Sequence, residues 1–179
     1  MAANNYLPET RISRFIDPII EQLGRWVSLI WLVLLGVIVL NVLMRYAFSE
    51  GRIELEELQW HLYSIGFLLG LSYAYKADTH IRVDVVHERL GPHIQAWIEL
   101  YGILLFLLPL IALILIFSVP FVMSSYQLHE VSQAPGGLPL RWLIKAFLPI
   151  GFIFLLLAVI ARLSRVWVYL FFSGSERGR

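Results

Sequence analysis

The sequence predicts an all-α integral membrane protein with four transmembrane helices and an N-terminal amphipathic helix at the membrane surface. Of its 179 residues, 59% are hydrophobic and only 15% are charged, whereas soluble domains average about 45–50% and about 25%. A membrane-spanning helix needs about 20 apolar residues, so the chain has room for four or five spans with short loops. No length remains for a soluble catalytic domain, and we expect no enzyme activity.

The composition excludes several kinds of site. The chain has no cysteine, which rules out disulfides, cysteine-bound zinc, iron–sulfur clusters and thiol catalysis. No run of lysines or arginines suggests a nucleic-acid surface. His80, His87 and His93 lack the spacing of a shared metal site. We therefore expect no metal, no cofactor and no nucleic-acid partner.

Residues 1–25 are predicted to form a cytoplasmic, interfacial segment before the first span. Apolar residues from Ile12 to Leu23 recur at the i, i+3, i+4 spacing of one helix face, and charged residues occupy the other face. This pattern is typical of an amphipathic helix lying in the membrane surface. Packing of the same stripe against the protein itself is an equal alternative. Pro18 predicts either a kink or a helix that begins near Asp17.

Four windows with few charged residues locate the spans. We expect them at residues 26–45, 57–76, 97–123 and 142–163, within one membrane domain over residues 26–172 and followed by a cytoplasmic tail at 173–179. The fourth window holds only 16 uncharged residues. It reaches about 20 if Lys145 extends its ammonium group to the lipid headgroups. Most of the tryptophans fall near the ends of these spans, where an aromatic belt is expected.

Counting lysine and arginine predicts the orientation. Ten of the 14 lie in the N-terminal segment, the loop between the second and third spans, and the C-terminal segment, and four lie in the other two loops. Cytoplasmic loops carry an excess of these residues. We therefore expect both termini and the middle loop to be cytoplasmic.

The outer ends of the first two spans carry a candidate ion pair. Arg45 closes the first span, and Glu56 and Glu57 open the second. The short loop between them brings the helix ends together, and carboxylates at a helix N-terminus are favoured by the helix dipole. We expect a pair between Arg45 and Glu57 that acts as a structural clamp, with a proton or ion relay as the alternative.

The second span carries small residues at Gly66, Gly70 and Ala74, a spacing that lets another helix approach closely. The apolar interiors of the spans contain no carboxylate. Ion-coupled transport sites normally need polar or ionisable groups inside the membrane or broken helices. We therefore expect no substrate-binding residue here, which disfavours a stand-alone transporter.

A haem-binding membrane anchor of a redox enzyme is the alternative function. His61 and His129 are expected at similar depth near the outer surface, and two histidines on neighbouring helices can ligate a haem. However, Glu130 follows His129 in a loop rich in polar residues, glycine and proline. Hydrogen bonding at the interface fits that environment better than haem ligation.

The chain resembles the small membrane subunit, of the DctQ type, of tripartite ATP-independent periplasmic (TRAP) transporters. The resemblance covers roughly residues 28–162 and rests on motifs in matching order. These are Arg-Tyr-Ala-Phe at 45–48, Glu-Glu-Leu at 56–58, the region of Gly70, and Lys-Ala-Asp-Thr-His-Ile-Arg-Val-Asp at 76–84. The last motif is the most specific. The chain departs from the family pattern where Ile53 or Leu55 stands in place of an aromatic residue.

The resemblance implies an accessory role in a bacterial inner membrane. In this family a large permease subunit holds the sodium and substrate sites, the small subunit braces its scaffold, and a soluble periplasmic protein delivers organic acids. The implied partners are therefore the large permease subunit, a transient periplasmic binding protein and membrane lipids. The loops at 46–56 and 126–141 would meet the binding protein.

The same resemblance implies structural roles for two groups of residues. Arg45 and Glu57 would fix the outer helix ends. His80, Arg82 and Asp84 would order the cytoplasmic loop.

Overall fold

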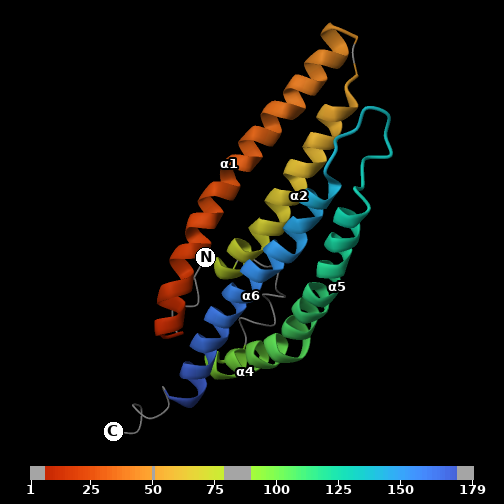
Figure 1. The fold of residues 1–179 in the computed structure, drawn as a ribbon. Helices are drawn as coiled ribbons and strands as arrows, with labels where there is room; N and C mark the ends of the chain where they lie inside the picture. The colour runs from red at the N-terminus through yellow and green to blue at the C-terminus, as the bar shows by residue number, and fades with distance from the viewer. Residues whose placement is uncertain (1–6, 50, 79–89, 173–179) are drawn as a thin grey trace.

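The computed structural model describes residues 7–49, 51–78 and 90–172, and every regular element in these ranges is a helix (Figure 1). The elements are α1 (Arg11–Ala47), α2 (Ile53–Lys76), α4 (Pro92–Gly102), the π-helical segment η1 (Ile103–Leu107), α5 (Leu108–Gln127) and α6 (Arg141–Phe171). The predicted all-α class is confirmed. The predicted tail at 173–179 lies outside the described residues.

Three helical stretches in the described part of the chain are long and apolar enough to cross a membrane. They are Arg11–Ala47, Pro92–Gln127 and Arg141–Phe171. They contain the first, third and fourth predicted spans. The second predicted span corresponds to α2, which is 24 residues long but carries more polar side chains. Three of the four predicted spans are therefore matched by such helices, and the crossing of α2 stays a prediction.

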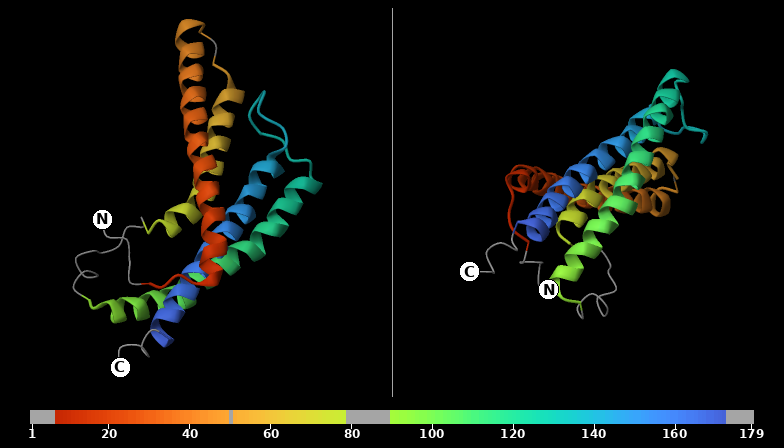
Figure 2. Two further views of the ribbon diagram at one scale, coloured as in Figure 1. Left: turned by 90° about the vertical axis from the view of Figure 1, so that its left-hand side faces the viewer. Right: turned by 90° about the horizontal axis from the view of Figure 1, so that it is seen from below.

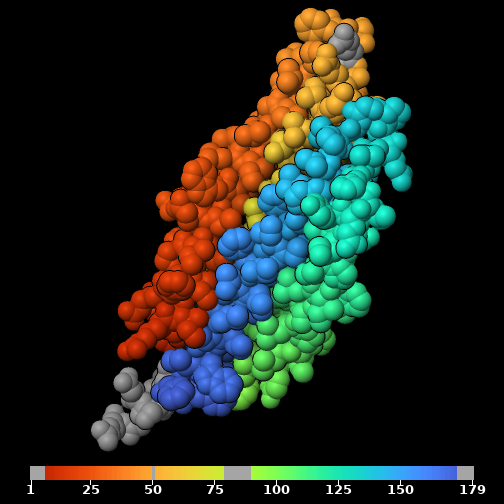
Figure 3. Space-filling view, viewed as in Figure 1, coloured from red at the N-terminus to blue at the C-terminus, as the bar shows by residue number. Residues whose placement is uncertain are grey.

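The helices form an open layer in the order α1, α2, α6, α5. The main packed pairs are α2 with α6, α1 with α2, and α5 with α6. The two further views show the α1–α2 pair crossing the α5–α6 pair at an angle (Figure 2). In the space-filling view, α6 forms a strip between α1 and the α4–α5 arm (Figure 3). The start of α1, the end of α2, the start of α4 and the end of α6 share one end of the layer, here called the inner end (Figure 1).

The N-terminal amphipathic stripe is the beginning of α1. A capping box starts the helix: the Thr10 side chain accepts from the Ser13 backbone N–H, and the Ser13 hydroxyl oxygen accepts from the Thr10 N–H. The helix continues through Pro18 to Ala47, so a separate interfacial helix is not present in the described residues. Ile16 and Ile20 pack against Ala158 and Ala161 of α6. The stripe therefore packs partly on the protein itself, which was the alternative interpretation.

The third apolar stretch is bent and starts earlier than predicted. Pro92 occupies the first turn of α4 after the extended Gly91, as a proline at a helix start should. In η1, the Leu108 backbone N–H donates to the Ile103 carbonyl five residues earlier. This wide turn precedes Pro109, whose ring would clash with a carbonyl in a regular helix. The α4 helix consequently runs across the inner end of α6 instead of continuing the line of α5 (Figure 1).

The backbones of α2 and α6 approach each other closely at Gly151. A Cβ built on Gly151 would lie 2.8 Å from the Leu68 carbonyl oxygen and 3.0 Å from the Leu68 carbonyl carbon. Only a residue without a side chain allows this approach of α6 to the α2 backbone. The centre of the layer is therefore held by backbone proximity at Gly151, a contact that the small-residue stripe of α2 did not predict.

Candidate functional site

Polar side chains gather in two groups, one at each end of the helix layer. The outer group surrounds Glu57 in the first turns of α2. Its carboxylate accepts a hydrogen bond from the Ser132 hydroxyl and another from the Leu138 backbone N–H at 2.6 Å. Gly137 lies against this contact, since a Cβ there would be 2.4 Å from the Ser132 side chain. Glu57 thus fastens the α5–α6 loop to the start of α2.

Glu130 fastens the other side of the same loop. Its carboxylate accepts from the Ser125 hydroxyl at 2.6 Å and from the Lys145 ammonium group. These two hydrogen bonds hold the pKa of the Glu130 carboxyl below its ordinary value of 4.5, and the bond from Lys145 has the larger effect. The Lys145 ammonium also lies 4.3 Å from the centre of the Phe121 ring. Lys145 therefore joins α5, the loop and α6.

Arg45 pairs with Glu56, and the predicted pairing with Glu57 is wrong. The Arg45 guanidinium donates to the Glu56 carboxylate across the short α1–α2 loop, and both side chains are about half exposed at 53% and 45%. Neighbouring helix positions are rotated by about 100°. Glu56 therefore faces α1 while Glu57 faces the loop after α5.

We expect Glu57→Gln to loosen the α5–α6 loop. A carboxamide presents one acceptor oxygen and one N–H₂ donor, so it cannot accept from both Ser132 and the Leu138 N–H in the same way. Amide hydrogen exchange at neutral pH should speed up several-fold across residues 130–139. Glu56→Gln is the matched control, because Glu56 contacts Arg45 instead of the loop. Equal exchange rates in the two variants would contradict the tether.

The lowered pKa of Glu130 predicts a pH dependence of stability. A carboxylate whose pKa is lower in the folded than in the unfolded state stabilises the fold fully above about pH 4.5, and this contribution is lost as the pH falls through the folded-state value. The melting temperature should therefore exceed that of Glu130→Gln by a constant amount between about pH 7 and pH 5.5. The difference should shrink below about pH 4.5. A difference independent of pH would count against the Glu130–Lys145 contact.

The inner group centres on Arg162 of α6. Its guanidinium binds Glu99 of α4 through two contacts, Nε to Oε1 at 2.5 Å and Nη2 to Oε2 at 3.1 Å. It also reaches Asp78, just beyond α2, at 3.5 Å. All three side chains are largely buried, with exposures of 10%, 13% and 17% for Arg162, Glu99 and Asp78. A paired guanidinium therefore joins three helices at the inner end.

Further polar contacts tie α1 to the same end. Arg165 donates to the Asp17 carboxylate. Lys76 donates to the Asp17 backbone carbonyl at 3.2 Å and lies 3.4 Å from the Glu21 carboxylate. The Thr10 and Ser164 hydroxyls are 2.7 Å apart. Every helix that reaches the inner end is therefore connected to α6 or α2 through side-chain contacts.

The predicted small face of α2 packs on α1. A Cβ on Gly66 would come within 3.2 Å of the Trp31 ring, and one on Gly70 would meet Val27 at 3.8 Å. Gly66 therefore contacts α1 closely, whereas Gly70 leaves space.

Several predicted residues are not brought together. His80, Arg82 and Asp84 lie outside the described residues. His61 contacts the Glu57 carbonyl through Nδ1 at 2.6 Å, and His129 follows α5 with a positive φ of 46°. In the described ranges no three histidine, aspartate or glutamate side chains are grouped to hold a metal ion.

The inner group was missed because Glu99 and Arg162 marked the ends of apolar windows. A charged residue at such a boundary normally reaches water or headgroups. Their opposite charges at the inner ends of successive spans were the available signal: the two spans run antiparallel, so both residues were already expected on the same side.

The chain matches a known protein family. The family model described as "Tripartite ATP-independent periplasmic transporters, DctQ component" matches residues 34–168, which is most of the chain. The matched range includes α2, α4, α5, the outer loop and Arg162. A search of curated proteins and a search of solved structures gave no match.

Proposed function

We propose, since the chain belongs to the DctQ family of tripartite ATP-independent periplasmic transporters, that it is the non-catalytic small permease subunit of a sodium-coupled organic-acid importer. Proteins of this family are membrane components that work with a large permease subunit and a periplasmic binding protein. In this proposal the chain scaffolds the large subunit, which carries the sodium and substrate sites.

The inner polar group carries this proposal. Arg162 is held by Glu99 and Asp78, so its charge is used to join helices. A residue that relays ions or protons must instead exchange partners during transport. The polar contacts of Glu57 and Glu130 likewise lie at the outer end and fasten a loop. This distribution supports a brace whose interior is apolar and whose ends are fixed.

The open layer supports docking on a larger protein. Many large apolar side chains remain exposed on α1, η1 and α5, among them Leu32, Leu35, Phe106 and Phe117. This open arrangement has two broad faces, so one can contact the permease while the other contacts lipid. We propose that residues 26–172 form this membrane domain and that Gly66 and Gly70 support the α1–α2 pair.

We place both termini in the cytoplasm of a bacterial cell, with the chain in the inner membrane. The positive-inside distribution supports this orientation, and so does the position of the described chain ends at one end of the layer (Figure 1). The segments 1–25 and 173–179 would then be cytoplasmic, and His80, Arg82 and Asp84 would lie in the cytoplasmic loop.

The outer loops are then available to the periplasmic binding protein. Tyr46 in the last turn of α1 and Phe48 just after it are 81% and 68% exposed, and Leu128 and Val131 after α5 are 76% and 62% exposed. Exposed apolar side chains beyond a membrane surface favour contact with a protein. The Glu57 tether would hold this surface in one shape.

Substitution of Arg45 by Ala separates a brace from an ion relay. The chain should co-purify with its large permease subunit in about equal amounts, and Arg45→Ala should leave assembly and uptake at similar, near-normal levels, because an exposed ion pair contributes under about 1 kcal/mol. Co-purification is measured by affinity capture of the tagged permease, and uptake in vesicles. Loss of uptake with assembly intact would overturn the structural role, and isolation of the chain as a stable monomer would overturn the partnership.

A further inference from the structure

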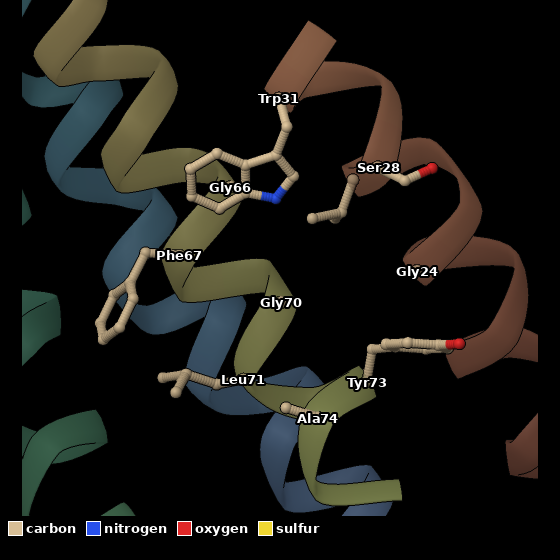
Figure 4. A pocket seen from close by; sticks show the side chains of 10 residues that line it. Gly24, Ser28, Trp31, Gly66, Phe67, Gly70, Leu71, Tyr73 and Ala74 are labelled. Atoms are coloured by element: carbon tan, nitrogen blue, oxygen red, sulfur yellow. The ribbon is translucent and has the colours of Figure 1, made fainter. Parts of the chain in front are cut away.

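An apolar groove of about 380 Å³ runs between α1 and α2 in the inner half of the layer. The groove is lined from α1 by Gly24, Ser28 and Trp31, and from α2 by Gly66, Gly70 and Tyr73. The close-up shows the glycines leaving the floor without side chains, with the Trp31 ring at one end and the Tyr73 ring at the other (Figure 4). We propose that this groove binds one acyl chain of an anionic phospholipid, whose phosphate lies beside Arg25.

The shape of the groove favours a thin chain over a protein helix. Gly24 and Trp31 are seven residues apart, which corresponds to about 10 Å along α1. The Tyr73 ring lies over Gly24, where a Cβ would come within 2.3 Å of it, and the Trp31 ring lies over Gly66, where a Cβ would come within 3.2 Å. These rings close both ends of the groove. A partner helix, about 10–12 Å wide with its side chains, would collide with them, whereas a single hydrocarbon chain fits between them.

The charge beside the groove favours an anionic headgroup. Arg25 follows Gly24, and the Ser28 hydroxyl that lines the groove donates to the Arg25 backbone carbonyl at 2.7 Å. Within the part of the chain that the structure describes, the Arg25 guanidinium donates to the Gln22 amide and forms no ion pair. The neighbouring Lys76 and Arg165 are, by contrast, paired with Glu21 and Asp17. Among the described cations near this groove, Arg25 thus keeps its charge available for a phosphate.

The depth of the groove fits the same lipid. Arg25 and Trp26 lie at the predicted boundary of the first span, where headgroups are expected, and the groove runs from there toward Trp31 inside the span. A lipid with its phosphate at Arg25 would therefore place the first part of its acyl chain along Ser28 and Gly70, between the two rings. This placement needs the membrane location of the chain but does not depend on the proposed scaffold role.

Quenching of Trp31 tests the proposal. The complex of the chain with its permease is reconstituted in two kinds of phosphatidylcholine vesicle. One contains a minor fraction of phosphatidylglycerol with brominated acyl chains, and the other contains the same fraction of phosphatidylcholine with brominated acyl chains. The quenching of Trp31 is the difference in quenched tryptophan fluorescence between this complex and its Trp31→Phe variant. Brominated phosphatidylglycerol should occupy the site about fivefold more strongly than brominated phosphatidylcholine. This is the effect expected of one arginine on an anionic lipid.

Three variants identify the groove as the cause. Gly70→Leu should remove the preference by filling the groove, and Arg25→Gln should remove it by deleting the charge. Gly36→Leu should leave it unchanged, since a Cβ there meets nothing within 4 Å and Gly36 does not line the groove. Co-purification with the permease checks that each variant is assembled. Equal quenching by both lipids, a preference that survives Gly70→Leu or Arg25→Gln, or protection of Trp31 from both lipids would overturn the proposal, the last because the permease would then cover the groove.

Discussion

Replacement of Arg162 by Ala is expected to destabilise the protein by about 3–5 kcal/mol, because it leaves the buried carboxylate of Glu99 without its cation and removes the contact with Asp78. This corresponds to a fall in melting temperature of roughly 6–20 °C for a chain of this size. The α4 helix should loosen from α6, since the two contacts between Arg162 and Glu99 join these helices. Thermal unfolding of the purified complex measures the effect.

A double substitution tests the cause of this loss. Arg162→Ala combined with Glu99→Ala removes both partners of the pair, and it should recover part of the stability because one buried charge is no longer unpaired. Arg45→Ala is the matched control, since the same residue type is removed from an exposed pair worth under about 1 kcal/mol. Similar losses for Arg162→Ala and Arg45→Ala would show that the inner group does not hold the helices.

Replacement of Gly151 by Leu is expected to force α6 away from α2. Even the Cβ would lie 2.8 Å from the Leu68 carbonyl oxygen, and backbone atoms cannot move aside as a flexible side chain can. Overpacking of this kind costs about 1–3 kcal/mol or more. We expect a lower melting temperature and weaker co-purification with the permease, because α2 and α6 form the centre of the layer.

Alanine variants of Gly36 and Gly151 separate the effect of packing on stability from the effect of helix propensity. Gly→Ala in a helix gains about 0.8–1.0 kcal/mol from propensity, so Gly36→Ala in open space should raise the melting temperature. Gly151→Ala has the same propensity gain but meets the α2 backbone, and it should lower the melting temperature. A rise in both variants would mean that α6 does not approach α2 as closely as the structure shows.

The sequence predicted the helices well because charged residues interrupt apolar windows at the ends of spans. Glu56 and Glu57 were expected at the start of the second helix, and they lie in the first two turns of α2. The predicted partner of Arg45 was wrong. Adjacent carboxylates on a helix point in directions about 100° apart, and composition does not set the rotation of a helix. That rotation follows from the contacts of Glu57 with the distant Ser132 and Leu138.

The buried inner group could not be predicted from local patterns. Whether a charge at the end of a span faces solvent or a partner depends on tertiary contacts, and Glu99 and Arg162 are 63 residues apart. The bend before Pro109 was similarly hidden, since a long uncharged window is compatible with either a straight or a bent helix. The π-helical turn before Pro109 determines the path of α4.

The π-helical segment η1 also constrains how the length of this chain can change during evolution. The π-helical turn holds one residue more than a regular turn, so loss of one residue from Ile103–Leu107 would restore a regular helix and bring α4 toward the line of α5. Glu99 would then move away from Arg162 together with α4. In relatives whose chain is one residue shorter at this place, selection would have no reason to keep an acid at the position of Glu99 together with a base at that of Arg162.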